Sequence, residues 1–286
     1  MITTMSIMAT PAGLYNWQIR SGGITSGGTW STFSILTGVY NIADQLETDL
    51  TTLITEIEAL GSTTVHVVGY GGGEVITSGT YTTTNAATHG GNIVYDAEGD
   101  SDKMFVFRCS AALALGASAT STLINGAKAS NIFWLVDGSL TIGATCDLKG
   151  TYIGASAVAP GDVFALEGRI LTLTGAIAMS NATYTRPIGT PSLVLGTINT
   201  FAFFTISGAI TNTVVTGGTG DVCSGDNGDI TGFDTIEGTV YTNTDTSFTD
   251  SVLTDASVRY NITGTSGSGH CKLLYEELIW DTGLYG

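Results

Sequence analysis

Hydrophobic residues recur at steps of three and four positions between residues 42 and 60, where they form one stripe: Leu46, Leu50, Leu53, Ile54, Ile57 and Leu60. That spacing places apolar side chains on one side of every turn and predicts an amphipathic helix over 42–60. Asn41 suits the capping position before it, and Gly61 suits the stop after it. The stripe is expected to pack on a face of the structure that the rest of the chain forms.

From Ser62 to Tyr241 the pattern changes to short β-branched and aromatic runs, such as VHVVGY, MFVFRC and GRILTLTGAIAM, interrupted by Gly, Asn and Asp. Such runs predict strands separated by turns. An antiparallel sandwich and a β-solenoid both give this pattern. Gly and Asn at the turns, many small side chains and few lysines favour the solenoid, in which like positions of successive coils stack.

The fold class expected is therefore all-β: an irregular right-handed β-solenoid (β-helix) with one long α-helix packed alongside. No fixed-length repeat is visible, so we expect coils of unequal length, roughly six of about 30 residues each. The domains expected are an N-terminal arm at 1–40, the solenoid with its helix at 41–250, and a C-terminal tail at 251–286. Residues expected inside the solenoid are Ile93, Phe105, Phe107, Ile124, Phe133, Leu135, Ile142, Ile153, Leu171, Leu173 and Ile177.

Three phrases in the middle of the chain are more specific than composition: INGAKASNIFW from Ile124 to Trp134, LKGTYIG from Leu148 to Gly154, and GRILTLTGAI from Gly168 to Ile177. In these phrases the chain resembles the ice-binding-like domain family. The resemblance implies a β-solenoid of the secreted antifreeze or ice-adhesion kind, with a long helix along it.

The order of the segments departs from that family. A stretch resembling residues 195–241 comes first in the family, ahead of the helix, whereas here it comes last. This implies a circular permutation, and the alternative is a complete domain followed by the start of a second one. Permutation predicts that the coil with Phe201, Phe203 and Ile206 lies against the coil of residues 171–177.

Charge restricts the partners. The chain has 9 Lys and Arg against 25 Asp and Glu, a formal net charge of −16. Binding to nucleic acid or to an anionic membrane depends on clustered cations, so neither is expected as a partner. Met1 to Tyr15 lacks a cation before its mildly apolar stretch, so no signal peptide is recognisable. The location expected is nevertheless extracellular or on a virion surface.

The sequence offers few candidate catalytic residues. No G-x-S-x-G elbow occurs, and the three histidines, His66, His89 and His270, are isolated. We therefore expect no enzyme, no catalytic residue and no cofactor.

The sequence also gives little indication of a metal site or a disulfide scaffold. The four cysteines are widely spaced and lack the spacing of a zinc site: Cys109, Cys146, Cys223 and Cys271. Buried thiols are expected, and Cys223 with Cys271 is the pair to test for a disulfide. No metal site is expected either. A solvated turn is favoured over a calcium site for the acidic loop of Asp221, Asp226, Asn227, Asp229 and Asp234.

Threonine carries one of two functional hypotheses. An ice-binding (antifreeze) protein of the resembled family would adsorb to ice through a flat face of Thr, Ser and Ala, although Thr is also an ordinary outward residue of strands. Val158, Pro160 and Asp162, after the LKGTYIG phrase, are expected to roughen such a face. Candidate ice-face residues are Thr80, Thr82, Thr84, Thr141, Thr145, Thr172, Thr174, Thr183, Thr211 and Thr213.

The other hypothesis rests on aromatic residues near the chain ends, which are typical of protein interfaces: Trp17, Trp30, Trp280, Tyr275 and Tyr285. They favour a non-enzymatic structural subunit, for example of a virion surface, fibre or extracellular filament, that self-assembles or binds other structural proteins. The sequence places this function ahead of ice binding, which is expected to be weak or absent.

Overall fold

The computed structural model describes the chain except residues 1, 10–13, 22–29, 37–39, 62–63, 215–216, 226–227, 234, 242–245, 248–269, 275–276 and 282–286, and it describes side chains only within residues 42–241. The chain divides into two compact units, one of Asn41–Asp245 and the other of Met1–Tyr40 with Thr246–Gly286. The domain organisation expected from the sequence stays a prediction.

The unit formed by the chain ends contains antiparallel strands. β1 (Ile2–Ala9), β2 (Leu14–Ser21) and β3 (Trp30–Leu36) form a three-stranded sheet. β28 (His270–Leu274) pairs with β29 (Glu277–Asp281), and β4 (Tyr40–Asn41) pairs with β27 (Thr246–Ser247). Trp17, Trp30 and Trp280 lie in strands whose side chains fall outside the described part, and Tyr275 and Tyr285 lie outside the described residues, so the assembly residues stay untested.

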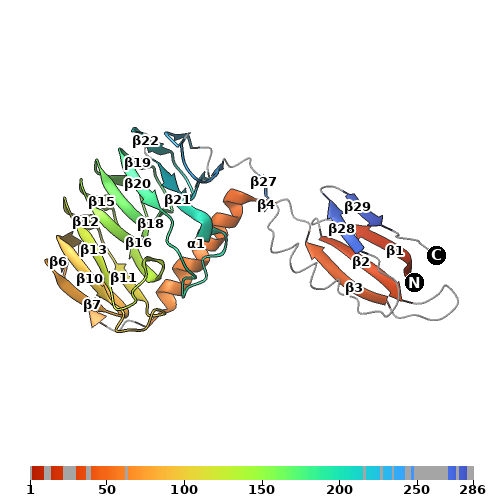
Figure 1. The fold of residues 1–286 in the computed structure, drawn as a ribbon, viewed down its shortest axis with the longest axis horizontal. Coiled ribbons are helices and arrows are strands. Elements are labelled where there is room, and N and C mark those ends of the chain that lie inside the picture. The colour runs from red at the N-terminus through yellow and green to blue at the C-terminus, as the bar shows by residue number, and fades with distance from the viewer. Residues whose placement is uncertain are drawn as a thin grey trace. The chain divides into compact units, whose positions relative to one another are not determined.

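The other unit is a β-solenoid whose strands stack in parallel from coil to coil (Figure 1). One side of it, which we call the helix-covered face, consists of β5 (Thr64–Val65), β8 (Gly79–Thr83), β11 (Phe105–Cys109), β14 (Ile132–Val136), β16 (Asp147–Gly154), β18 (Phe164–Thr172), β21 (Phe201–Thr205), β24 (Asp221–Ser224) and β26 (Val240–Tyr241). Parallel pairing throughout this face rules out the antiparallel sandwich.

Two further sides complete each coil. The second side, which we call the Thr/Ala face, is an eight-stranded sheet of β6 (Gly69–Gly71), β9 (Ala87–Gly90), β12 (Leu113–Leu115), β15 (Leu140–Ile142), β17 (Val158–Pro160), β19 (Ile177–Met179), β22 (Ile210–Asn212) and β25 (Ile230–Thr231). The third, the charged face, contains the first halves of β16 and β18 with β7 (Glu74–Thr77), β10 (Asn92–Asp96), β13 (Thr120–Ile124), β20 (Ala182–Thr185) and β23 (Gly218–Thr219).

The described coils are shorter and more numerous than the roughly six of about 30 residues that the sequence analysis expected. Each of the eight strands of the Thr/Ala face marks one coil. The distance along the chain between successive strand starts ranges from 18 residues (69 to 87) to 33 residues (177 to 210). Insertions at the corners cause this range, which explains why no fixed repeat is visible in the sequence.

The predicted helix is present as α1 (Ile42–Ala59), and it runs along the stack of strands (Figure 1). Leu46, Leu50, Leu53 and Ile57 are fully buried. They pack in one cluster with outward residues of the helix-covered face, namely Val106, Phe133, Leu135, Ile153, Leu171 and Phe204. The predicted packing of the apolar stripe on one solenoid face is therefore confirmed.

Part of the predicted solenoid interior is wrong, because some of its residues pack against α1 instead. Phe133, Leu135, Ile153 and Leu171 are buried, but they belong to the cluster beneath α1. Because side chains alternate along a strand, their neighbours point into the solenoid instead, as Trp134, Tyr152 and Ile170 do. Ile93, Phe105, Phe107, Ile142 and Ile177 are inside as predicted, whereas Ile124 and Leu173 are only half-buried.

A long connection between β20 and β21 completes the cover of the helix-covered face. It runs past the short helix η1 (Ala129–Asn131), where the backbone N–H of Ser192 donates to Asn131 Oδ1 at 2.9 Å, and ends in η2 (Gly196–Thr200). The backbone N–H of Thr197 donates to Asp49 Oδ2 of α1 at 2.6 Å. We call residues 186–195 the strap.

The coil of β21 lies directly on the coil of β18, with Ile170 opposite Phe203 and Leu171 opposite Phe204. This is the contact that permutation predicted, although the permuted order relative to the family stays a prediction. Among the described residues, no helix has both the length and the apolar character needed to cross a membrane.

Candidate functional site

The three faces of the solenoid present different outward residues. The helix-covered face is apolar and lies beneath α1. The charged face carries an ion-pair ladder, in which Lys149 Nζ lies 2.9 Å from Asp147 Oδ1 and 3.8 Å from Glu167 Oε2. Charged groups hold their own hydration shells strongly. The Thr/Ala face has neither the helix cover of the first face nor the ion-pair ladder of the charged face.

The Thr/Ala face carries one column of small outward residues. In most of its strands the middle residue is outward and the two flanking residues are buried, as with Leu140 and Ile142 around Thr141. The strand register stacks these middle residues coil on coil. The central column consists of Thr88, Ala114, Thr141, Ala159, Ala178, Thr211 and Thr231.

Small residues also flank this column on both sides. The positions just before the strands hold Ala86, Ala112, Ser139, Ala157, Ala176 and Ala209. The positions on the other side hold Gly90, Gly116, Gly143, Gly161, Ser180 and Thr213. From β9 to β22 the face therefore lacks long and charged side chains across these three columns, whereas the position before β25 holds the exposed Asp229.

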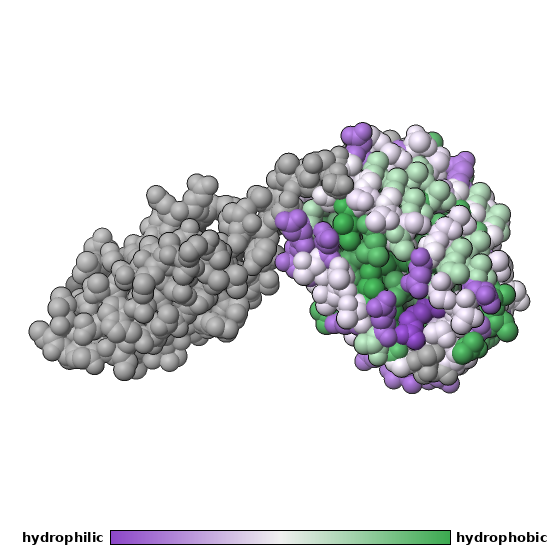
Figure 2. Space-filling model, turned by 180° about the vertical axis from the view of Figure 1, so that it is seen from behind, coloured by the Kyte–Doolittle hydropathy of each residue, from purple (hydrophilic) through white to green (hydrophobic). Residues whose placement is uncertain are grey.

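Close stacking of the coils explains two of the glycines. A Cβ at Gly143 would lie 2.5 Å from the backbone N of Ala117, and one at Gly161 would lie 2.5 Å from the backbone N of Ala144. Real Cβ atoms do not approach backbone so closely, so any side chain there would push the coils apart. Figure 2 shows one side of the solenoid unit, on which white and pale green rows run in parallel beside a green hydrophobic area and purple hydrophilic patches.

The structure separates the predicted ice-face residues into several groups. Thr141, Thr211 and Thr213 lie on the Thr/Ala face, and Thr145 lies at the corner beside it. Thr183 points outward on the charged face, and Thr84 and Thr174 are at exposed corners. Thr80 and Thr82 are in β8 of the helix-covered face, and Thr172 is fully buried.

Sequence reasoning missed Thr88, Thr231 and the three alanines of the central column. The signal that marks them is a triplet of buried residue, Thr or Ala, and buried residue, as in Leu-Ala-Leu at 113–115 and Ile-Ala-Met at 177–179. Irregular coil lengths hide this triplet, because it recurs at no fixed spacing.

The expected roughening of the face is wrong at two of its three residues. Val158 and Pro160 are buried and point inward, while Ala159 between them points outward. Asp162 is exposed at the corner, where its Oδ1 accepts hydrogen bonds from Val163 N at 3.0 Å and from Ser180 Oγ at 3.1 Å. Alternation along the strand, which the linear sequence does not reveal without a register, causes the difference.

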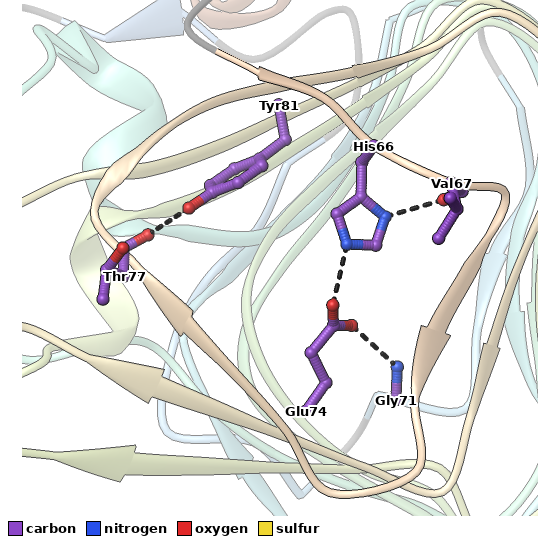
Figure 3. Close-up of polar contacts among 6 residues, drawn as sticks. All are labelled: His66, Val67, Gly71, Glu74, Thr77 and Tyr81. Atoms are coloured by element: carbon purple, nitrogen blue, oxygen red, sulfur yellow. Dashed lines mark hydrogen bonds and ion pairs between the residues drawn. The ribbon is translucent and has the colours of Figure 1, made fainter.

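The histidines of the described part serve the structure. His66 Nε2 lies 2.8 Å from Glu74 Oε1 (Figure 3). The His66 ring also stacks on Tyr70 with centroids 4.1 Å apart. The pair ties the segment after β5 to β7 and so closes the first coil. His89 is buried behind the Thr/Ala face, and burial lowers its pKa from 6.5 to about 4.

The acidic loop and the thiols are only partly described. Asp221 Oδ1 accepts a hydrogen bond from the backbone N–H of Thr239 at 2.8 Å and Asp229 is exposed, while Asp226, Asn227 and Asp234 lie outside the described residues. Within the described residues no cluster of three His, Cys, Asp or Glu suits a metal ion. Cys109, Cys146 and Cys223 are buried, whereas the Cys271 side chain is outside the described part, so the proposed disulfide stays a prediction.

Comparison with known proteins identifies relatives. The family model described as "Ice-binding-like" matches residues 3–185. An ice-binding protein of Flammulina populicola is 29% identical over 175 residues, which cover 57% of this chain and 69% of that protein. Ice-binding protein 1 of Shewanella frigidimarina is 32% identical over 110 residues, which cover 38% of this chain and 12% of that protein.

One solved structure is also similar to this chain. The crystal structure of an ice-binding protein from an Antarctic bacterium of the Flavobacteriaceae is 30% identical, covers 74% of this chain and 51% of its own, and has a TM-score of 0.47. The chain therefore spans about half of that protein.

These findings overturn the function that the sequence analysis placed first. The matching family model is described as ice-binding-like and the curated relatives bear the name of ice-binding proteins, and none of them points to a virion or filament subunit. The aromatic residues near the ends misled the interpretation, because aromatic side chains in a sequence do not reveal whether they are buried in their own unit or exposed for a partner.

Proposed function

Because the chain belongs to the ice-binding-like family, we propose that it binds ice through the Thr/Ala face of its solenoid. The observation that carries the proposal is the central column, in which seven successive coils present only Thr or Ala outward: Thr88, Ala114, Thr141, Ala159, Ala178, Thr211 and Thr231. Ice is the partner in this proposal, and no chemical reaction is expected to accompany binding.

The physical argument starts from the nature of an ice surface, which is a rigid array of water molecules. A protein surface that matches it must also be rigid, since ordering mobile side chains costs free energy on binding. Ala has no side-chain rotamers, and the branched Cβ of Thr restricts its χ1. Thr adds a hydroxyl group for hydrogen bonding and a methyl group that lowers the cost of removing water.

The backbone makes the same surface rigid. Neighbouring strands in a sheet lie about 4.8 Å apart, so the outward residues repeat at a fixed interval along the stack. Gly143 and Gly161 let the coils approach without an intervening side chain. The surface is therefore already ordered before it contacts ice.

The other faces support the choice by contrast. The helix-covered face is occupied by α1, and the charged face presents Asp147, Lys149 and Glu167. Ionised groups keep their own water, so dehydrating them against ice is costly. An extracellular location follows as part of the proposal, since environmental ice forms outside the cell.

The test compares two matched threonine variants. Thr141→Tyr places a ring in the middle of the central column, and Thr183→Tyr places the same ring on the charged face. Both positions are exposed, so both variants should fold and show the circular dichroism of the unmodified protein. We expect thermal hysteresis and inhibition of ice recrystallisation in the unmodified protein and in Thr183→Tyr, and their loss in Thr141→Tyr.

Two outcomes would contradict the proposal. Absence of hysteresis in the purified unmodified protein would remove ice binding as its function. Equal activity of both tyrosine variants would show that the Thr/Ala face is not the surface that meets ice.

A further inference from the structure

Val163 has a backbone conformation that its side chain disfavours. It lies at the corner where the Thr/Ala face meets the charged face, between β17 and β18, with φ at +54°. Left-handed backbone is rare for β-branched residues because Cβ and its branches crowd the carbonyl group. Val163 is nonetheless 49% exposed, so core packing does not account for this strain.

Equivalent corners in neighbouring coils adopt the same conformation. Ser118, Thr145 and Asn181 have φ values of +58°, +57° and +51°. The register of the following strands stacks these corner residues on one another, since Asp147 pairs with Thr120 and with Ala165, and Phe164 pairs with Ala182. We call Ser118, Thr145, Val163 and Asn181 the corner row.

The corner row runs beside the Thr/Ala face. Its members come one or two residues after the outer column that contains Gly116, Gly143, Gly161 and Ser180. Ser118 Oγ lies 2.9 Å from Thr145 Oγ1, so that pair is linked. Ser and Asn have polar groups that can bond local backbone in a left-handed corner, whereas Val has none.

Val163 and Thr145 have the same branched shape. They occupy stacked positions in adjacent coils, and both have the stiff, methyl-bearing branch that the Thr residues of the Thr/Ala face also have. The carboxylate of Asp162 is turned back to Val163 N and Ser180 Oγ, so one of its oxygens is held within the corner.

We propose that the corner row, with the exposed methyl groups of Val163 at its centre, is a further part of the surface that contacts ice. The proposal rests on the proposed function, because it extends the Thr/Ala face by one more column. The strained valine is then explained as a contact residue whose role lies in binding rather than in stability.

The experiment measures thermal hysteresis and melting temperature for three substitutions at one site. Val163→Gly and Val163→Asn remove the branched side chain from a left-handed corner, so each should raise the melting temperature, by about 2–4 °C for glycine. Each should also lose part of the hysteresis. Val163→Thr keeps the shape and should retain both the hysteresis and the melting temperature.

A control separates the corner from exposed apolar groups in general. Ile188 on the strap is 89% exposed, and Ile188→Asn should leave hysteresis unchanged. Val163→Gly with full hysteresis, while Thr141→Tyr has none, would overturn the corner proposal and leave the proposed function standing. Full hysteresis in Thr141→Tyr as well would contradict the proposed function itself. A melting temperature that falls in Val163→Gly would overturn the corner proposal too, because the side chain would then be structural.

Discussion

The helix-covered face and the Thr/Ala face are built on the same coils, yet their outward residues differ in size and in exposure to solvent. In both, the strands alternate inward and outward residues. On the first, the outward residues are large and apolar, such as Phe133 and Leu171, and α1 covers them. On the second, they are Thr and Ala, and all of them are exposed except the half-buried Thr211. Under the proposed function, this solenoid therefore separates stability from binding by assigning each to a different side of one repeating unit.

The largest effect should come from the helix-covered face. Phe133→Ala empties a fully buried site beneath α1 and should lower the free energy of unfolding by about 3–5 kcal/mol. Chemical denaturation monitored by circular dichroism measures this loss. Below the melting temperature the remaining folded protein should retain its thermal hysteresis, because the Thr/Ala face is unchanged. Loss of hysteresis in the folded variant would mean that the two faces are coupled.

The next effect lies directly behind the Thr/Ala face. His89 is fully buried, and burial lowers its pKa from 6.5 to about 4, so the unfolded state binds a proton more readily than the folded state. Stability from neutral His89 is present above about pH 6.5 and is lost progressively as the pH falls toward 4, by about 3 kcal/mol in total. Urea unfolding at pH 7 and pH 4.5 measures the decrease. His89→Phe should weaken that pH dependence, and an unchanged slope would assign it to other groups.

A smaller effect should come from the spacing between coils. Gly161→Ala would place a Cβ 2.5 Å from the backbone N of Ala144, so the coils must shift. We expect a loss of about 1–3 kcal/mol of stability, as for other overpacked sites, together with reduced hysteresis because the outward columns lose their common plane. Gly99→Ala is a control in a loop with open space around it, although its φ of +88° adds some strain of its own. A stable Gly161→Ala variant would show that the corner adapts to a side chain.

The smallest change in stability should accompany a large change in binding. Thr141→Tyr alters an exposed residue and should change the free energy of unfolding by no more than about 0.5 kcal/mol. Thermal melting measures this. A loss well above that value would mean that Thr141 contributes to the fold, and the comparison of the two faces would then need revision.

Several elements were predictable because local patterns fixed them. The 3.6-residue spacing of Leu46, Leu50, Leu53 and Ile57 was enough to place α1 within one residue at its end. Short apolar runs between turn residues indicated strands, and the phrases from Ile124 to Ile177 indicated the family. Each of these signals lies within a short stretch of chain.

Other features depended on register. Val158 and Pro160 look like exposed irregularities in the sequence, yet both are buried, and the small Ala159 is the outward residue. Whether Thr141 and Thr172 share a face depends on which coil stacks on which, and only Thr141 is exposed. A shift of one residue would exchange inside and outside, and linear spacing alone does not fix that shift when coil lengths vary from 18 to 33 residues.

The sequence by itself determined the helix, the β-rich character, the acidic charge and the family resemblance, because each is a local or additive property of residue types. Only the tertiary structure decided which threonines form a surface and which apolar residues lie beneath the helix. Those outcomes arise from stacking between coils far apart in the chain, where hydrogen bonds between parallel strands fix a register that places Thr88, Thr141, Thr211 and Thr231 in one column.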